Sequence, residues 1–377
     1  MYERCIILAI TEQQVYYEKR LEELLKEMPY FVIEYVDDKM DHRSPLTLFN
    51  YVRDFKMFFE WLMAEGIVKC DSIKEFPVEA LGTLPLNDVK NYFKWLSRKK
   101  YKKGRESHRI SKRTVNRHIS ALRSLFKYLT VETEISNGKP YFERNVMAKI
   151  QVHKIKETLN ERSRKLSRMI FDNGVDIDFL EFVKNDYANT LSPAQKRYFA
   201  RDKERDYAIL SLFLGTGMRL NELANLRLKD IDFTGCKISV VRKGNKKDTI
   251  AATPSSLEDL KKYLDIRKDR YGAADSPNEF VFVKKYKGEA VPLTNRAIEN
   301  IVYKYTQAFD KRMSPHKLRH TYATNLAEVT GGDIHLIMSQ LGHTDPETSL
   351  LYINSGIEKQ IRAAEKLDQR RKNENAN

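Results

Sequence analysis

The chain has 377 residues, 32% of them charged, and a formal net charge of +15. That length is enough for two domains of ordinary size. The excess of Lys and Arg indicates a polyanionic partner, either nucleic acid or an anionic membrane surface. The apolar run at residues 5–10 is too short for a signal peptide or a membrane span, so we expect a cytoplasmic protein without membrane contact. The three scattered cysteines form no C-x-x-C pair, and we expect free thiols.

The first half of the chain is helical in pattern. A charged helix is expected over residues 11–28. Apolar residues then recur at intervals of three and four over 46–63, over 86–96 and again from 111 onward, which is typical of amphipathic helices with one buried face. We therefore predict a helical domain over residues 1–155, followed by a polar linker over 156–185.

The densest charge lies at residues 94–127, where thirteen Lys and Arg residues stand against the single acid Glu106. A charge run of this kind is often only a solvated surface. Here the excess has one sign, and a helix N-terminus near Ser111 would also attract phosphate, so we favour a face that binds the DNA backbone. With Arg242 from the second half, the residues expected to contact DNA are Lys99, Lys100, Lys102, Lys103, Lys112, Arg113 and Arg117.

Residues 186–377 are predicted to form a second, mainly helical domain. It opens with an apolar helix over 206–214. Strands at 237–242 and 249–252 flank Gly244-Asn245, a strong hairpin signal. Helices are expected over 256–268, 294–310, 316–328 and 333–341, and a last amphipathic helix over 356–371.

Four short segments of this second domain carry the residue types of phosphoryl transfer. Taken singly, each has an ordinary explanation: a surface ion pair, a solvated lysine, exposed helix residues and a core tyrosine. Their combination in one order and spacing favours a shared chemical site. In chain order they contain Arg219 with Glu222, Lys243 at the hairpin tip, His316 with Arg319 and His320, and His343 nine residues before Tyr352.

Cleavage of a phosphodiester explains why these types belong together. Attack builds negative charge on the phosphate oxygens, which two guanidinium groups can neutralise. A tyrosine hydroxyl is a weak nucleophile that needs a base and a positive field, and the departing 5′ oxygen needs a proton that a lysine can supply. The sequence has neither a carboxylate cluster for paired metals nor a Walker-type loop for ATP. We therefore expect no metal, no cofactor and a covalent intermediate.

Together, the motifs Gly215-x-Gly-x-Arg219-x-x-Glu222, Lys243-Gly, His316-x-x-Arg319-His320-Thr321 and Leu341-Gly-His343 with Tyr352 resemble the active site of the tyrosine recombinases. The match is closest to the single-component, XerS-like Xer type. Residues 28–35 and 140–147 are similar to that type as well, so the resemblance covers most of the chain. It implies a SAM-like helical core-binding domain and a mainly helical catalytic domain with a small antiparallel β-sheet. The catalytic residues that it implies are Arg219, Lys243, His316, Arg319, His343 and the nucleophile Tyr352, with Glu222 and His320 as supporting residues.

The resemblance also implies partners and a role. The enzyme would cut and rejoin double-stranded DNA at paired half-sites through a 3′-phosphotyrosine link. It would act as a homo-tetramer on two DNA sites, with the last helix of each protomer docked on a neighbour through the stripe Ile357, Ile361, Ala364 and Leu367. Resolution of chromosome dimers, with the translocase FtsK as a partner, is the implied role. Two departures are Asp248, where many members have a basic residue, and Asn354, where many have His.

Three alternatives stay open at this point. Within the recombinases, the chain could be the integrase or resolvase of a mobile element or plasmid. A type IB topoisomerase uses similar residues, but the spacing of His343 and Tyr352 and the last helix argue against it. A catalytically inactive DNA-binding protein is the third alternative, and the complete residue set argues against that one.

Overall fold

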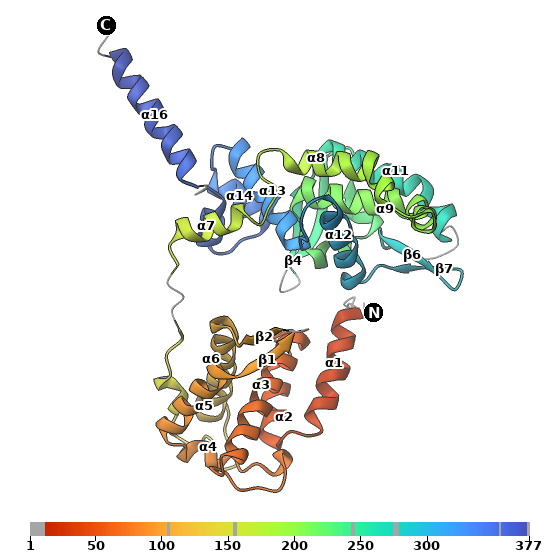
Figure 1. Cartoon of the computed structure of the whole chain (residues 1–377). Helices are drawn as coiled ribbons and strands as arrows, with labels where there is room; N and C mark the ends of the chain where they lie inside the picture. Colours follow the sequence, from red (N-terminus) through yellow and green to blue (C-terminus); the bar gives the residue numbers. More distant parts are fainter. Residues whose placement is uncertain are drawn as a thin grey trace, which may run out of the picture. The chain divides into compact units, whose positions relative to one another are not determined.

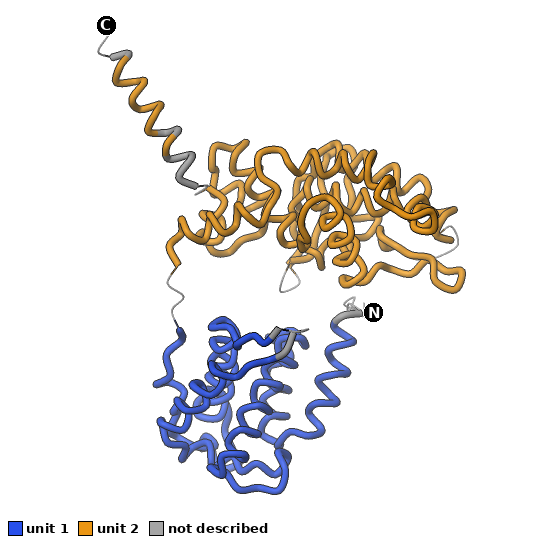
Figure 2. Tube along the Cα trace, in the orientation of Figure 1, with its two compact units in different colours: residues 1–156 blue, residues 157–377 orange. Residues whose placement is uncertain are grey.

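A computed structural model describes residues 12–103, 106–153, 157–242, 246–273, 279–353 and 356–374 of the chain. The chain divides into two compact units, residues 1–156 and 157–377 (Figure 2). Each unit contains a large hydrophobic core of its own. Within the described ranges, no helix has the length and apolarity to cross a membrane.

The first unit consists of helices and one small hairpin (Figure 1). Its elements are α1 (Glu12–Leu25), α2 (Tyr30–Lys39), α3 (Pro45–Ala64), α4 (Glu79–Thr83), α5 (Leu86–Arg98), β1 (Lys100–Lys103), β2 (Glu106–Arg109) and α6 (Lys112–Lys127). The helix α3 begins with Ser44 as its cap, and the apolar face that includes Phe55 and Phe58 is fully buried. This confirms the helical character expected of the first domain.

The hairpin β1–β2 was not predicted, and it lies directly between α5 and α6. Lys100 pairs with Arg109 in the hairpin, and the backbone N–H of Ile110 donates to the carbonyl of Lys99 at 3.2 Å. The chain thus returns to the end of α5 before α6 begins. Ser111 caps α6 by accepting from the backbone N–H of Thr114 at 3.1 Å.

The second unit is also mainly helical, with small antiparallel sheets, as expected. The strands β3, β4 and β5 form one sheet in that order, and β6 and β7 form a hairpin. The helices are α7 (Leu159–Ser167), α8 (Val175–Glu181), α9 (Pro193–Thr216), α10 (Leu220–Ala224), α11 (Pro254–Tyr271), α12 (Asn295–Phe309), α13 (Pro315–Val329), α14 (Ile334–Leu341), α15 (Pro346–Ile353) and α16 (Gly356–Glu374). The strands are β3 (Ile231–Asp232), β4 (Lys237–Arg242), β5 (Lys246–Ala251), β6 (Val283–Tyr286) and β7 (Glu289–Pro292).

The predicted linker over residues 156–185 requires correction, because most of it is folded into the second unit. Thr158 and Glu161 form a capping box that starts α7. Phe171 and Phe179, which follow, are 1% and 0% exposed and belong to the core of the second unit. The structural boundary therefore lies at residues 156 and 157, about thirty residues before the predicted start of the second domain.

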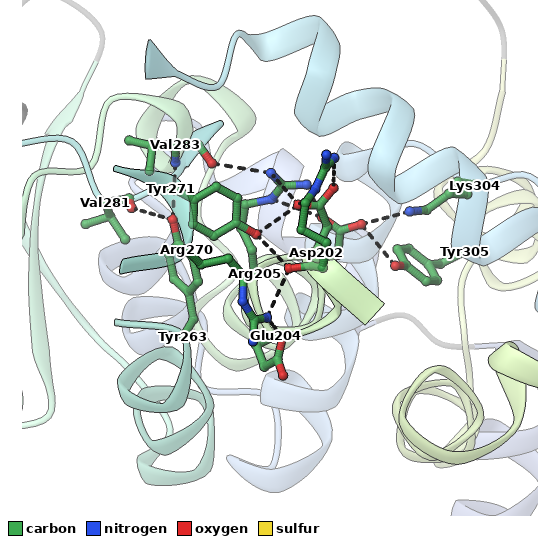
Figure 3. A network of polar contacts seen from close by, with 12 residues as sticks. Asp202, Glu204, Arg205, Tyr263, Arg270, Tyr271, Val281, Val283, Lys304 and Tyr305 are labelled. Atoms are coloured by element: carbon green, nitrogen blue, oxygen red, sulfur yellow. Dashed lines mark hydrogen bonds and ion pairs between the residues drawn. The ribbon is translucent and has the colours of Figure 1, made fainter. Parts of the chain in front are cut away.

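A buried polar network holds α9 against its neighbours in this unit (Figure 3). One carboxylate oxygen of Asp206 accepts two N–H groups of Arg205, and the other accepts from Lys304 Nζ at 2.8 Å and from the hydroxyl of Tyr305 at 3.0 Å. Arg205 also donates to the carbonyl of Val283 in β6. The network therefore joins α9 to α12 and β6, and it fixes the helix that leads to the candidate site.

Helix α16 projects from the rest of the second unit (Figure 1). Ile361 and Leu367, two members of the predicted docking stripe, are 48% and 67% exposed. Ala364 is exposed too, and the side chain of Ile357 lies outside the described part of the chain. The helix thus presents apolar side chains that its own unit leaves uncovered.

Candidate active site

The site begins where α9 ends. Gly217 closes α9 in the left-handed conformation with φ +66°, and a Cβ atom there would lie 2.3 Å from the ring of Tyr322. Only glycine fits both the conformation and the space. Two residues later, Arg219 caps α10, and its backbone N–H donates to Glu222 Oε2 at 2.7 Å. The turn thus fixes the position of the Arg219 guanidinium.

Glu222 is a buried bridge between two arginines. Its Oε1 accepts from Arg219 Nη1 at 2.9 Å and from Arg242 Nη1 at 3.2 Å, and only 3% of its side chain is exposed. A carboxylate at this depth is stable because two cations and a backbone N–H share its charge. This contact is consistent with the supporting position expected for Glu222.

Arg242 was expected to contact DNA, and the structure instead shows it nearly buried and bonded within its own unit. Its side chain is 9% exposed. It donates to Glu222, to Asp248 Oδ2 at 2.9 Å, and to the carbonyls of Leu341 and Gln340 at 3.1 and 2.9 Å. Arg242 therefore joins β4 to the end of α14. Asp248, expected to affect local DNA contacts, is instead the partner of this arginine.

Arg319 reaches the same place from α13. It is 2% exposed and donates to the carbonyl of Gly217 at 2.7 Å and to that of Leu341 at 2.5 Å. Burial, followed by the positive charge of Arg219, lowers the pKa of Arg319 to about 10. The guanidinium remains protonated at neutral pH, but it lies in surroundings that would favour an added negative charge.

The C-terminal carbonyls of α14 organise all three guanidinium groups. Arg242 contacts residues 340 and 341, Arg319 contacts residue 341, and Arg219 donates to the carbonyl of Gly342 at 3.0 Å. The end of a helix carries partial negative charge and unpaired carbonyls, so it attracts cations. A Cβ atom on Gly342 would lie 2.7 Å from the Arg242 guanidinium, and this close approach therefore requires glycine.

Two of the candidate histidines lie beside these arginines. His343 Nε2 is 3.3 Å from Arg319 Nη2, and its Nδ1 is 2.9 Å from Ser349 Oγ. Burial, followed by the positive charges of Arg319 and Arg219, lowers the pKa of His343 to about 4. His316 is more exposed, and partial burial of its ring together with the same two arginines lowers its pKa as well.

Tyr352 lies on α15 and is 1% exposed. Its hydroxyl is 2.6 Å from Nδ1 of His320, and its ring stacks on that of His343 at 6.1 Å between centroids. Burial raises the pKa of Tyr352 to about 12, although Arg319 and Arg219 oppose the shift. The structure thus brings Arg219, His316, Arg319, His343 and Tyr352 together, and it places His320 on the tyrosine hydroxyl itself.

Some predicted residues lie outside the described part of the chain. Lys243, expected at the hairpin tip, is one of them, as are the side chains of Lys102 and Lys103. In the described ranges, no group of three or more His, Cys, Asp or Glu side chains could hold a metal ion.

The basic residues predicted in the first unit are mostly exposed. Lys99 and Lys100 follow α5, and Lys112 and Arg113 lie in the first turn of α6. We call these residues and Arg109, which pairs with Lys100 in the hairpin, the basic cluster. Arg117 differs, because its Nη1 donates to the buried Asp54 at 2.5 Å and to the carbonyl of Asn50. Through these two contacts, Arg117 supports the fold of the first unit.

Two contributors to the site were not predicted. Ser349 is fully buried and holds Nδ1 of His343. Gln340 bonds to backbone groups of both Thr216 and Ala251 and so ties α14 to α9 and β5. A serine before the apolar run Leu350-Leu351 was a usable signal for a buried polar contact, whereas nothing local distinguishes Gln340.

Both the sequence and the fold of this chain are similar to those of known proteins. Residues 181–358 match the phage integrase family, and residues 33–133 match the N-terminal SAM-like domain of phage integrases. The tyrosine recombinase XerS of Streptococcus agalactiae serotype III (strain NEM316) is 38% identical over 351 residues, which is 93% of this chain and 98% of the relative. XerS of Streptococcus mutans serotype c (strain ATCC 700610 / UA159) is 36% identical over the same shares.

The fold is similar to that of solved recombinases. The XerH site-specific recombinase in a post-cleavage complex with a palindromic difH substrate matches with a TM-score of 0.65 at 22% identity, over 94% of this chain and 90% of that one. The Tn1549 transposon integrase, in complex with circular intermediate DNA, matches with a TM-score of 0.54 at 18% identity, over 89% and 97% of the two chains.

Proposed function

This chain belongs to the tyrosine recombinase family and is a site-specific DNA recombinase of the Xer type, and from that premise we propose that Tyr352 is its nucleophile. The hydroxyl would attack the scissile phosphate, displace the 5′ oxygen and leave a 3′-phosphotyrosine intermediate. The bond energy would be kept in that link, so religation would need no cofactor. The main support for this proposal is that four residues from separate segments meet at one site: Arg219, Arg319, His343 and Tyr352.

The arginines are assigned to the phosphate. Arg219 has 40% of its side chain exposed, so it can meet a phosphate that approaches from solvent. Arg319 lies deeper and would complete the positive field. We assign His316 and His343 to the same phosphate as hydrogen-bond donors, and Lys243 to protonation of the departing 5′ oxygen.

Replacing Tyr352 with Phe tests this assignment. The ring would still pack against His343 while the nucleophilic oxygen would be gone. We expect DNA binding to persist and no covalent adduct to form on a DNA substrate with a nicked site, as judged by the appearance of a slower protein band. An adduct with Tyr352→Phe would show that another residue attacks.

We further propose that the basic cluster contacts the DNA backbone and that four protomers assemble on two DNA sites of paired half-sites. Support for assembly comes from α16, whose Ile361 and Leu367 are exposed. An uncovered apolar stripe of this kind suits a neighbouring protomer. Deleting the chain after residue 355 should leave half-site binding intact and remove the higher assemblies, which gel shifts on half-sites and full sites would separate.

For the biological role, we propose resolution of chromosome dimers in the cytoplasm, with the translocase FtsK as a partner. The similarity to XerS over nearly the whole chain supports this role over that of a mobile-element integrase. Covalent cleavage sites mapped across the host genome would decide. A single site near the replication terminus is expected, and sites at the ends of a mobile element would point to integration.

A further inference from the structure

His320 makes the one hydrogen bond that the described residues offer to the Tyr352 hydroxyl. The distance from His320 Nδ1 to the tyrosine oxygen is 2.6 Å, and the ring centroids are 5.5 Å apart. Tyr352 is 1% exposed, so water has little access to compete for this contact. A contact this short, in a protected place, joins the two groups before any DNA is bound.

Accepting that Tyr352 is the nucleophile, we propose that His320 is a catalytic residue, the base that takes the hydroxyl proton during attack. The O–H bond breaks, and its electron pair forms the new bond to phosphorus while the proton moves to Nδ1. The bond from phosphorus to the 5′ oxygen breaks, and that oxygen receives a proton from the acid assigned to Lys243. On religation the imidazolium returns its proton to the tyrosine oxygen.

The surroundings of His320 favour this role. Burial, then the charges of His316, Arg319, His343 and Lys317, lower the pKa of His320 to about 3. The ring is therefore neutral at physiological pH. Because the hydroxyl of Tyr352 is a donor, Nδ1 must be the accepting nitrogen.

DNA binding would strengthen this base. The groups that face His320 are its helix neighbours His316, Lys317 and Arg319, together with His343 from the segment after α14 and Tyr352 from α15. All the charged or chargeable groups in this set except Tyr352 are basic. A phosphate bound among them brings negative charge, which favours the protonated imidazole and thus raises the basicity of His320.

The other two histidines are less suited to this step. His343 uses Nδ1 for Ser349 and Nε2 for Arg319. His316 contacts the His320 ring at 4.2 Å between centroids, and none of the hydrogen bonds found among the described residues joins it to Tyr352. The geometry therefore assigns the proton to His320 and leaves His316 free to contact the phosphate.

The test distinguishes two roles of His320: accepting a hydrogen bond from the Tyr352 hydroxyl, and taking up its proton. In His320→Asn, an amide oxygen can still accept the hydrogen bond, but an amide does not take up a proton near neutral pH. Cleavage of a nicked DNA substrate should fall at least 100-fold at pH 7, within the usual range for loss of a general base. The remaining rate should rise about tenfold per pH unit, because only tyrosinate would react. His335→Asn, an exposed histidine on α14, is the matched control and should cleave normally.

A fluorinated tyrosine at position 352 provides a second test of the proposed base. Its hydroxyl ionises more readily and needs less help from a base. It should restore most of the lost rate to His320→Asn, yet change the otherwise unaltered chain little and leave Lys243→Ala defective. Selective rescue also shows that His320→Asn is folded.

Either of two results would overturn the inference: cleavage by His320→Asn within threefold of the unaltered chain, or no rescue by the fluorinated tyrosine. Tyr352→Phe is run beside them. If it is inert while His320→Asn is normal, only the base assignment fails. If it still cleaves, the proposed nucleophile fails first and the base assignment falls with it.

Discussion

The two units of this recombinase hold their cations in opposite ways. In the first unit, four members of the basic cluster, Lys99, Lys100, Lys112 and Arg113, are exposed. In the second, Arg242 and Arg319 are buried and satisfied by carbonyls and a carboxylate. Exposed cations attract an anionic partner through their summed charge, and salt screens that attraction. Buried guanidinium groups act through position, because the backbone fixes where their charge lies.

The largest expected difference concerns Arg319. Replacement with Ala should reduce the cleavage rate at least 1,000-fold, about 4 kcal/mol, because the phosphate loses a desolvated charge partner. Lys should restore little, since an ammonium group cannot reach both the Gly217 and Leu341 carbonyls as a guanidinium does. Single-turnover cleavage measures the effect, with Arg312→Ala, an exposed arginine of the same unit, as the control. Activity of Arg319→Ala within tenfold of the unaltered enzyme would contradict the positional account.

Asp206→Asn tests whether buried charge in the second unit is equally important for stability. The amide cannot accept on its nitrogen side, so it leaves Arg205 or Lys304 poorly paired (Figure 3). We expect a loss of about 3 kcal/mol in the free energy of unfolding in urea. Asp265→Asn, at an exposed position on α11, should change it by less than about 0.5 kcal/mol. A loss below about 1 kcal/mol for Asp206→Asn would show that the network contributes little.

We expect a lower pH to destabilise the second unit more than the first. The pKa of His320 is about 3 and that of His343 about 4, both below the ordinary value. Between pH 6.5 and 4, the unfolded second unit therefore binds more protons than the folded one. Its stability falls as the pH falls, by on the order of 2 kcal/mol at pH 5 for His320 alone.

In the first unit, two opposite shifts offset each other. Burial lowers the pKa of His118 and raises that of Asp54, although the charge of Arg117 opposes the shift of Asp54, whose Oδ1 lies 3.1 Å from His118 Nε2. Over the same pH range, folding removes a proton from His118 and adds one to Asp54. The two contributions to the pH dependence of the first unit's stability therefore nearly cancel. Hydrogen exchange on the full chain at pH 7 and pH 5 should show that the protection of backbone amides falls selectively in residues 157–374. Equal weakening of both units would contradict these shifts.

The smallest effect is expected from the basic cluster. Lys112→Gln with Arg113→Gln should lower the log–log salt slope of DNA binding by roughly 0.9 for each phosphate that the protein no longer neutralises, on any sequence. Lys69→Gln with Lys74→Gln, two other lysines of the first unit, is the control. An unchanged slope in the first pair would mean that this part of the cluster is only solvated.

Periodicity predicted the long elements well. The helix expected over 46–63 is observed as Pro45–Ala64, that over 333–341 as Ile334–Leu341, and the strand over 237–242 as Lys237–Arg242. These elements alternate buried and exposed side chains at a constant interval, and this interval is visible in a single sequence. Helix α7 was missed because it is short and polar, although its capping box Thr158-x-x-Glu161 was readable.

The site was predictable in its residue types and less so in its contacts. The motif spacing identified Arg219, Arg319, His343 and Tyr352, and the structure brings them together. The motif spacing could not reveal that Arg242 is buried. Its burial depends on how β4 packs on the end of α14, a segment about a hundred residues away. Nor does the spacing distinguish His316 from His320, since only the packing of α15 decides which ring meets the hydroxyl.

Helix α7 has a practical consequence for dissecting the enzyme. Ser163 donates to the carbonyl of Leu351 at 3.2 Å, and Arg162 pairs with Glu347, so α7 supports the helix that carries Tyr352. A catalytic fragment cut at the predicted boundary of residue 186 would lack this support together with Phe171 and Phe179. It would retain every motif residue and still misplace its nucleophile. A fragment intended to cleave DNA on its own should therefore begin near residue 157.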